Sequence, residues 1–408
     1  MQAAGRPAAV AGNLWKLLAM QACRWFLLLM PVLNLFYAEN GLSLQDVFVV
    51  QAFFSICVIL FEVPSGYFSD RLGRRRSLLI GSIAGAVGFG VYAFATALPH
   101  FFLAQFLIAI GASFLSGTDT AMLYDTLLQL GREGEFQKVA GRYGSIGNFS
   151  EGTAALVGGS LALISLRTPL YGQAVLMFCI IPLAWSLVEP QRTRLQASES
   201  SFRSVLRIVR YALHGHAEVK WLILYSSLVG TSTLTIVWFV QPYLVAADLP
   251  LVWFGVAWAV LQFSVGFFAL IAYRIEAMIG RSSALVSLIL LSSGGYFALS
   301  QVQALWAAPL LLLLYFVRGI NGPVLGDYIN RCVSSDIRAT VLSVKALVGR
   351  MMFVALGPTA GWISDAYGLG HAFAFCGAVF FGFGLLFLLF LWRNGVLADQ
   401  DGNGRTTP

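Results

Sequence analysis

Charged residues are scarce in this chain. Only 11% of the 408 residues are Asp, Glu, Lys or Arg, whereas a soluble globular protein carries about 25%. Hydrophobic residues make up 58% of the sequence. A soluble protein of this length would not need so much apolar sequence for its core, because the fraction of surface that is buried on folding rises only slowly with chain length. The composition therefore excludes a soluble fold, and despite the net charge of +7 we expect no nucleic-acid partner.

Cysteine and histidine are also too few and too scattered to build a site. The five cysteines stand singly, and His214 and His216 are the only close pair among four histidines. No metal site or disulfide framework is indicated, and we expect no metal and no cofactor. The sequence also lacks a Walker phosphate loop, a dinucleotide fingerprint and a Ser/His/Asp grouping. These absences argue against an ATP-driven pump and an enzyme, and leave a membrane-embedded sensor or enzyme as a remote alternative.

Long apolar runs, in contrast, recur along the whole sequence. A membrane-spanning helix needs about 20 such residues. Twelve segments qualify, at 14–37, 47–68, 76–98, 101–127, 139–165, 169–188, 219–245, 251–275, 283–301, 304–330, 337–363 and 370–392. The first holds Arg24 near its middle and is followed at once by a second span, so we interpret it as a helix of the mature protein rather than a signal peptide.

The longest link between spans divides the chain into two halves. We predict an all-α integral membrane fold with a first six-helix bundle at 1–188, a linker at 189–218 and a second bundle at 219–408. Within the linker, Phe202, Leu206 and Val209 recur at helical spacing with arginines between them. This pattern predicts an amphipathic helix that lies on the membrane surface.

The positions of the basic residues predict the orientation of the chain. If both termini are cytoplasmic, 21 of the 26 Lys and Arg lie in cytoplasmic tails or links. Only Arg167 lies on the opposite face, and four fall inside spans. Such an excess is typical of the cytoplasmic side of a membrane protein. We therefore expect a multi-pass protein of the cell membrane, in contact with lipid.

The link between the second and third spans carries a motif, Gly-Tyr-Phe-Ser-Asp-Arg-Leu-Gly-Arg-Arg, at residues 66–75. It resembles the G-x-x-x-D-R-x-G-R-R signature of the major facilitator superfamily in both sequence and location. The resemblance implies two pseudo-symmetric six-helix bundles, alternating access and, in most members, a monomer. It also implies that the motif closes the cytoplasmic side, with Gly66, Asp70, Arg71, Gly73, Arg74 and Arg75 as gate residues.

Two further stretches resemble the superfamily but depart from it. In the fourth span Gln105 stands where the family has an arginine, whereas the tenth span keeps one, Arg318, followed by Asn321. The eleventh span aligns with the fifth at an offset of 203 residues, although Ala-Ala replaces the Gly-Pro of the antiporter motif in the fifth. This alignment predicts two homologous repeats, with helix-packing roles for Gly158, Gly159, Gly357, Pro358 and Gly361.

Ionisable residues inside the spans are expected to have an ionic partner or a functional role, because the insertion of each at the bilayer centre costs about 2.5–3.5 kcal/mol. A rise of about 1.5 Å per residue places Glu62 roughly 9 Å, Asp119 roughly 12 Å, and Arg24 and Lys345 roughly 13 Å from the cytoplasmic face. The family's packing places the second and eleventh spans side by side, which implies a gate pair between Glu62 and Lys345. A permanent bridge between Arg24 and Glu62 is the alternative, and both stay open.

The remaining buried polar groups suggest how transport is driven. Burial shifts a carboxylate towards loading a proton at working pH, so Asp119 and Glu151 are candidates for proton coupling. Arginines can bind an anionic solute or neutralise those acids. The substrate-cavity candidates are Arg24, Arg318, Arg350, Asn321, Trp238, Gln241 and Tyr243. We predict a proton-coupled secondary transporter of a small organic solute, first as a multidrug-type exporter and alternatively as an importer of an anionic nutrient or chelator, such as a siderophore, carboxylate or sugar.

Overall fold

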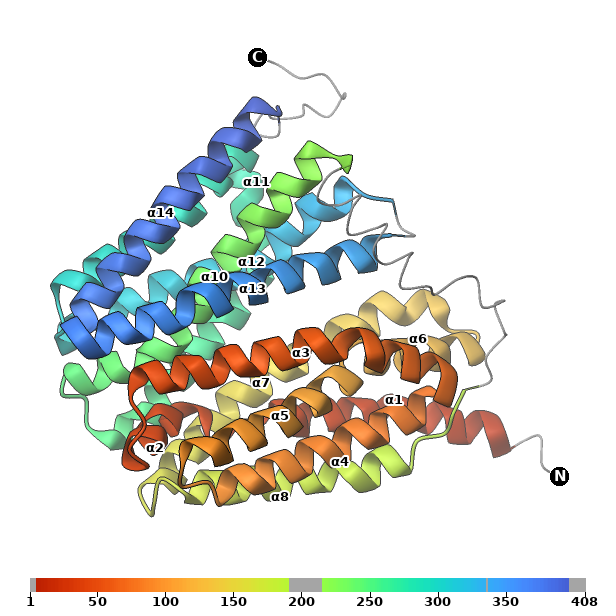
Figure 1. Ribbon diagram of the computed structural model, residues 1–408. Helices are drawn as coiled ribbons and strands as arrows, with labels where there is room; N and C mark the ends of the chain where they lie inside the picture. Colours follow the sequence, from red (N-terminus) through yellow and green to blue (C-terminus); the bar gives the residue numbers. More distant parts are fainter. Residues whose placement is uncertain (1–4, 191–214, 335–336, 396–408) are drawn as a thin grey trace. The chain divides into compact units, whose positions relative to one another are not determined.

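The computed structural model describes residues 5–190, 215–334 and 337–395. These residues form helices joined by short links, without a strand among them (Figure 1). This confirms the predicted all-α membrane fold. The amphipathic helix expected in the linker lies outside the described residues.

Among the described residues, ten helices are long and apolar enough to cross a membrane. Two features relate this number to the twelve predicted spans. Helix α11 (Phe254–Gln301) has 48 residues, about 72 Å at 1.5 Å per residue, which is more than twice the thickness of a hydrocarbon core. Gly280, with φ 77° and ψ 164°, divides it into two helices. Helix α7 (Phe136–Ala162) has 27 residues and is long enough to span, but Lys138, Arg142 and Glu151 make it more polar. The structure is therefore consistent with twelve spans.

The chain forms two compact units. The first comprises Met1–Leu42, Val50–Ser198 and Leu251–Gln262, and the second Ser43–Val49, Glu199–Pro250 and Phe263–Pro408. The first turns of α3 (Leu44–Leu72) thus belong to the second unit, and the first turns of α11 to the first. The division at 189–218 that the sequence suggests stays a prediction.

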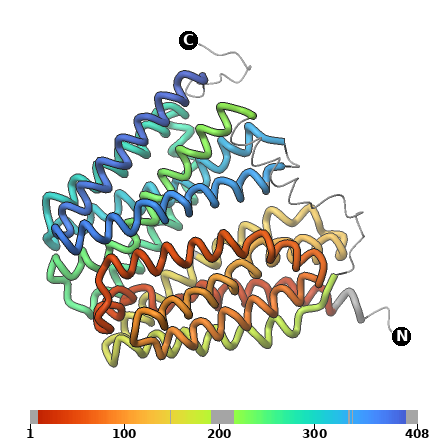
Figure 2. The backbone as a smooth tube through the Cα atoms, in the orientation of Figure 1, coloured from red at the N-terminus to blue at the C-terminus, as the bar shows by residue number. Residues whose placement is uncertain are grey.

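Helices of the first unit pack closely through small residues. They are α1 (Gly5–Trp25), η1 (Met30–Val32), α2 (Leu33–Glu39), most of α3, α4 (Arg74–Ala93), α5 (Leu98–Leu115), α6 (Thr118–Gln129), η2 (Glu133–Glu135), α7 and α8 (Thr168–Trp185). Helix α4 contacts both α5 and α8 (Figures 1 and 2). A Cβ on Gly111 would lie 2.7 Å from the backbone nitrogen of Gly85, so α4 and α5 approach at backbone distance.

Two spans of the first unit are interrupted. The first breaks between α1 and α2, and the fourth breaks at Gly117, which has φ 73°. Backbone groups inside a membrane must find partners within the protein. At the first break, the Leu28 N–H donates to the buried Gln173 Oε1 at 2.8 Å. The Leu28 carbonyl lies against α7, where a Cβ on Gly158 would be only 1.9 Å from its oxygen.

In the second unit, α10 is the most enclosed helix. The unit comprises the first turns of α3, α10 (Ala217–Ala246), most of α11, η5 (Leu305–Leu310), α12 (Leu311–Arg331), α13 (Arg338–Tyr367) and α14 (Leu369–Arg393). Helix α10 contacts α12, α13 and α14. Its hydroxyls join it to α13, because Ser227 donates to the Lys345 carbonyl at 2.9 Å and Thr231 to the Gly349 carbonyl at 3.1 Å. Such interhelical hydrogen bonds stabilise helix association in lipid.

Candidate functional site

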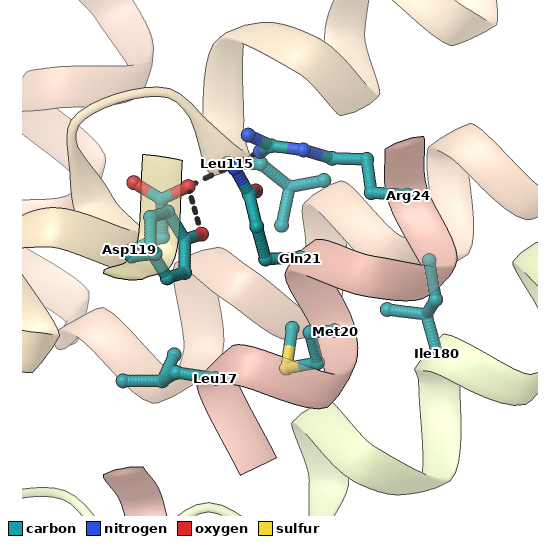
Figure 3. A pocket seen from close by; sticks show the side chains of 8 residues that line it. Leu17, Met20, Gln21, Arg24, Leu115, Asp119 and Ile180 are labelled. Atoms are coloured by element: carbon teal, nitrogen blue, oxygen red, sulfur yellow. Dashed lines mark hydrogen bonds and ion pairs between the residues drawn. The ribbon is translucent and has the colours of Figure 1, made fainter. Parts of the chain in front are cut away.

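A partly buried ion pair joins the two interrupted spans. Arg24 occupies the last turn of α1, and Asp119 occupies the first turn of α6. Arg24 Nη1 lies 3.2 Å from Asp119 Oδ2, with side chains 27% and 7% exposed (Figure 3). Tyr143 of α7 donates its hydroxyl to the same Oδ2 at 2.6 Å. Three helices therefore converge on one carboxylate.

The helix ends favour this arrangement electrostatically. The C-terminal end of a helix carries partial negative charge and the N-terminal end partial positive charge. Arg24 therefore lies at the favourable end of α1, and Asp119 at the favourable end of α6. Asp119 Oδ1 also accepts the Thr120 N–H at 2.6 Å and the Thr120 hydroxyl at 3.1 Å. Gly117 makes the site possible, because its positive φ lets α6 begin inside the membrane.

A small cavity of ≈ 10 Å³ adjoins the ion pair. It is about large enough for one water molecule. Gln21 lines it, is 6% exposed, and its Oε1 has no hydrogen-bond partner among the described residues. Buried carbonyl oxygens are normally satisfied, so the cavity suits a water that bonds to Gln21. The lining residues are Leu17, Met20, Gln21, Arg24, Leu115, Asp119, Tyr143 and Ile180 (Figure 3).

The pairing of Arg24 differs from the alternative that depth alone suggested. Its ion pair is with Asp119 and not with Glu62. Sequence reasoning identified both residues separately and missed their pairing, because it treated the first and fourth spans as continuous helices. The adjacent Ser116 and Gly117 were the available signal of a break. The pair between Glu62 and Lys345 stays a prediction.

The link motif at residues 66–75 is held to the end of α8. Gly73 has φ 103° and precedes α4, and a Cβ on it would lie 3.2 Å from the Glu189 carboxylate. That carboxylate accepts the N–H groups of Arg74 and Arg75 at 2.9 and 2.8 Å, so it caps α4. Arg74 Nε also lies 2.8 Å from Asp125 Oδ2 of α6. Sequence reasoning identified the motif but missed Glu189.

The other arginines of the motif make local contacts. The Arg75 guanidinium donates to the Trp185 carbonyl at 2.7 and 3.2 Å, near the end of α8. Arg71 donates to the Tyr67 hydroxyl at 2.5 Å and lies over the Tyr67 ring. Gly66 and Asp70 are exposed at the end of α3. The gating role of the motif stays a prediction.

Two cavity candidates of the second unit meet the middle of α10. Arg318 Nη1 donates to the Thr233 carbonyl at 3.0 Å. The Asn321 amide nitrogen faces Gly230, 3.4 Å from where a Cβ would be, and its Oδ1 is buried without a partner among the described residues. Arg350 is partly buried on α13. Arg318 and Asn321 of α12 thus contact the same region of α10, as expected of residues three apart on a helix.

The remaining candidates lie further along α10 and are buried. Trp238, Gln241 and Tyr243 are all at most 8% exposed. The Tyr243 hydroxyl is within 3.2 Å of the carbonyls of Val302 and Ala304, so it holds the link that precedes η5. Their contact with a solute stays a prediction. Among residues 5–190, 215–334 and 337–395, no three His, Cys, Asp or Glu side chains are grouped as metal ligands would be.

The predicted packing glycines all lie at close helix contacts. A Cβ on Gly159 would be 2.6 Å from the Gly255 Cα of α11. On α13, a Cβ on Gly361 would be 2.8 Å from the Gln45 Cα, and one on Gly357 would be 3.0 Å from the Phe48 ring. Pro358 lies between them inside α13. Their effect on packing in the membrane stays a prediction that substitution can test.

The sequence model of the Major Facilitator Superfamily matches residues 17–358. The chain belongs to this superfamily. It is accordingly a multi-pass membrane protein and a secondary transporter. A relative in Bacillus subtilis (strain 168), described as the uncharacterized MFS-type transporter YxaM, is 22% identical over 358 residues. The match covers 84% of this chain and 86% of the relative.

Solved structures of the superfamily share the fold along nearly the whole chain. The nucleoside transporter NupG matches with a TM-score of 0.76 at 16% identity, covering 94% of this chain and 98% of that one. A D-xylose-proton symporter matches with a TM-score of 0.70 at 16% identity, covering 98% and 99%. The POT family transporter PepTSo matches with a TM-score of 0.72 at 15% identity, covering 94% and 98%. At these identities the likeness concerns the fold alone.

Proposed function

We propose that this superfamily member is a proton-coupled symporter of a small anionic organic solute. In this proposal Asp119 binds the proton, and Arg24 binds the anionic group of the solute. The observation that carries the proposal is the ion pair between Arg24 and Asp119 at the breaks of two spans. Discontinuous helices inside a membrane commonly bind substrates and coupling ions, because they expose charged helix ends and free backbone groups at depth.

The coupling follows from the charges. While Asp119 is ionised, it neutralises Arg24 and leaves the guanidinium occupied. Protonation of Asp119 removes that partner, and an uncompensated cation inside the membrane is costly. A solute carboxylate can then take its place with a bidentate contact to the guanidinium. Arg24 is 27% exposed on its side chain, so it is accessible to a solute. Proton and anion therefore bind together and leave together.

The alternative, multidrug-type export, requires a proton and a solute to alternate at one carboxylate. A cationic drug that approached Asp119 would meet the Arg24 guanidinium 3.2 Å away, and like charges at that distance repel strongly. The geometry therefore favours an anion moving with the proton over a cation moving against it. The motif at residues 66–75 is expected in exporters and importers alike, so it does not favour either direction of transport.

The remaining features of the proposal concern the whole chain in its membrane. We place both termini on the cytoplasmic side of the cell membrane, as the basic residues suggest, and treat the protein as a monomer. On that topology, residues 66–75 lie at the cytoplasmic side, where a gate formed by the motif closes access in one state. The ion pair between Glu62 and Lys345 would contribute to the same gate.

Transport by purified protein in liposomes under an imposed pH gradient tests the proposal. The panel comprises carboxylates, iron chelators, sugars, nucleosides, peptides and cationic drugs. For the wild type we expect accumulation of one anionic solute, in the direction of proton flow. Asp119→Asn mimics the protonated acid, so it should still exchange that solute across the membrane without accumulating it. Arg24→Gln should raise KM for the solute by about tenfold or more, because it removes a charge-assisted contact.

Glu135→Gln is the matched control. Glu135 lies in the exposed η2 turn, where hydrogen bonds from Arg132 at 2.8 Å hold the pKa of its carboxyl below the ordinary value. It is an ionised acid outside the spans, so its loss should leave accumulation unchanged. Movement of a cationic drug against the proton gradient, or unaltered coupling in Asp119→Asn, would overturn the proposal.

A further inference from the structure

A tight seam joins α7 to the first turns of α11 within the first unit. Backbone meets backbone there, since a Cβ on Gly159 would lie 2.6 Å from the Gly255 Cα. A Cβ on Gly255 would likewise lie 2.6 Å from the Ala155 carbonyl oxygen. Glu151 precedes Ala155 by one helical turn and lies on the same face of α7, so it continues the seam.

The seam ends in a buried carboxylate that the proposed coupling mechanism does not use. Glu151 is 8% exposed. Its Oε1 accepts hydrogen bonds from Gln262 Nε2 and, at 3.4 Å, from Trp258 Nε1, and both donors lie on α11. Two donors from one helix therefore bind one oxygen from another.

Hydrogen bonds between helices contribute to the association of α7 with α11 in lipid. Lipid tails are as apolar as the helix faces, so apolar contact alone gives helices little reason to associate. The glycines of the seam remove steric obstacles without adding attraction of their own beyond close packing. The hydrogen bonds to Glu151 are thus the directional contacts that hold α7 in register with α11.

We propose that Glu151, with Gln262 and Trp258, is a latch that holds α7 against α11 and opens when the two helices separate during transport. On the predicted topology the seam occupies the extracellular half of the membrane, so the latch closes the outer side. The role requires an acceptor oxygen at position 151 and does not require a proton to be carried there. This inference rests on membership of the superfamily and is independent of the coupling role proposed for Asp119.

Distances between spin labels on the two helices test the latch. The labels go on Ile164→Cys, exposed just beyond the end of α7, and Val252→Cys, exposed in η4 (Leu251–Trp253), which precedes α11. The background lacks the five native cysteines. Glu151→Gln keeps the acceptor oxygen, whereas Glu151→Leu and Gln262→Leu remove one side of the bond. Pulsed electron resonance in lipid nanodiscs measures the ratio of separated to joined helices.

We expect Glu151→Gln to keep the wild-type distance distribution and gradient-driven transport. Gln262→Leu should raise the ratio of separated to joined helices by about fivefold, the effect of losing one hydrogen bond. Glu151→Leu loses both hydrogen bonds and should raise the ratio further. Where Glu151→Leu fails to fold, Trp258→Phe provides the second test, because it keeps an aromatic side chain and removes the indole N–H donor.

Two results would overturn the latch. One is a distance distribution that is the same in Gln262→Leu, Trp258→Phe and the wild type. The other is loss of accumulation in Glu151→Gln with unchanged distances, which would make Glu151 a proton carrier instead. Neither result depends on Asp119→Asn, so the latch and the coupling proposal can fail separately.

Discussion

Single side chains at the helix breaks determine how the site holds charge. The groups facing Asp119 are Arg24 from α1, Tyr143 from α7 and the Thr120 hydroxyl on α6 itself. Each presents a positive charge or a hydrogen-bond donor to a carboxylate oxygen. These contacts fix the position of the carboxylate beside Arg24, so the loss of any one of them should disturb the ion pair on which the proposed coupling depends.

Tyr143→Phe should impair transport. The substitution removes a donor at 2.6 Å from Asp119 and preserves the ring. A hydrogen bond to a charged group contributes about 1.5–3 kcal/mol, so its loss should disturb the ion pair with Arg24 and lower uptake by about tenfold. Initial uptake rates in liposomes, normalised to inserted protein, measure this. Tyr171→Phe, at an exposed position on α8, is the control and should keep the wild-type rate. An unchanged rate in Tyr143→Phe would show that the hydroxyl does not contribute to the site.

Gly158→Ala should destabilise the protein. The new methyl group would lie 1.9 Å from the Leu28 carbonyl oxygen, and backbone cannot yield as a flexible side chain does. Overpacking of this kind costs about 1–3 kcal/mol. The thermal unfolding midpoint in detergent should fall clearly below that of the wild type. Gly144→Ala on the same helix is the matched control, since nothing lies within 4 Å of its Cβ. Equal midpoints for both variants would contradict the close packing at the break.

At the scale of helices, one contact shows how an element is fixed by a residue remote in sequence. Helix α3 has its own capping box, in which Ser43 and Asp46 bond reciprocally at 2.9–3.2 Å. Asp365 of α13 adds a second cap and accepts the N–H groups of Leu44 and Gln45 at 3.2 and 2.7 Å. The negative carboxylate also suits the positive end of α3.

Asp365→Ala should loosen the start of α3. Losing an exposed cap of this kind costs about 0.5–1 kcal/mol. Amide hydrogen exchange at residues 44–48 should become severalfold faster, while exchange in the middle of α10 should stay unchanged. Asp365→Asn retains one acceptor oxygen and should give an intermediate rate. Asp327→Asn, which breaks an exposed pair with Arg331 on α12, is the control. Exchange at the wild-type rate in Asp365→Ala would show that the capping box alone fixes α3.

Helices were more predictable from the sequence than their interruptions. The predicted span 219–245 corresponds to α10, and the gap between 275 and 283 contains the kink at Gly280. The break at residues 26–29 consists of apolar residues, and Pro31 after it is a weaker signal, because proline is also tolerated in membrane helices. Two contacts of Leu28 stabilise the break: its N–H donates to Gln173, and its carbonyl packs against Gly158, which has no side chain. Only the folded chain brings these residues together.

The same limitation applies to the site. Depth along the spans placed Arg24 and Asp119 at nearly the same level, yet their pairing could not be predicted because 95 residues separate them. The pair of Asp327 and Arg331, four apart on α12, was predictable and is present at 2.6 Å. Local spacing therefore reveals local pairs, whereas functional pairs depend on packing between helices.

At the scale of the whole molecule, one short segment from each half of the sequence groups with the compact unit formed mainly by the other half. The first turns of α3 group with α13, and the first turns of α11 group with α7. Under the predicted repeat these are equivalent contacts, since the second and eighth spans correspond, as do the eleventh and fifth. Each combines close glycines with an acidic side chain, Asp365 in one and Glu151 in the other.

Alternating access also requires a contact that closes the cytoplasmic side, and the Glu62–Lys345 pair is the predicted one. Because two charges at close range interact strongly when they are away from water, either single reversal should impair the gate. Glu62→Lys and Lys345→Glu should each lower transport about tenfold or more, and the double reversal should restore most of it. Uptake in liposomes, normalised to inserted protein, measures all three. Arg24→Gln in the double-reversal background, compared with Arg24→Gln alone, is the control for a contact of Glu62 with Arg24, because rescue through the Glu62–Lys345 pair does not need that guanidinium. Failure of the double reversal, with both single variants correctly folded, would remove this pair from the gate.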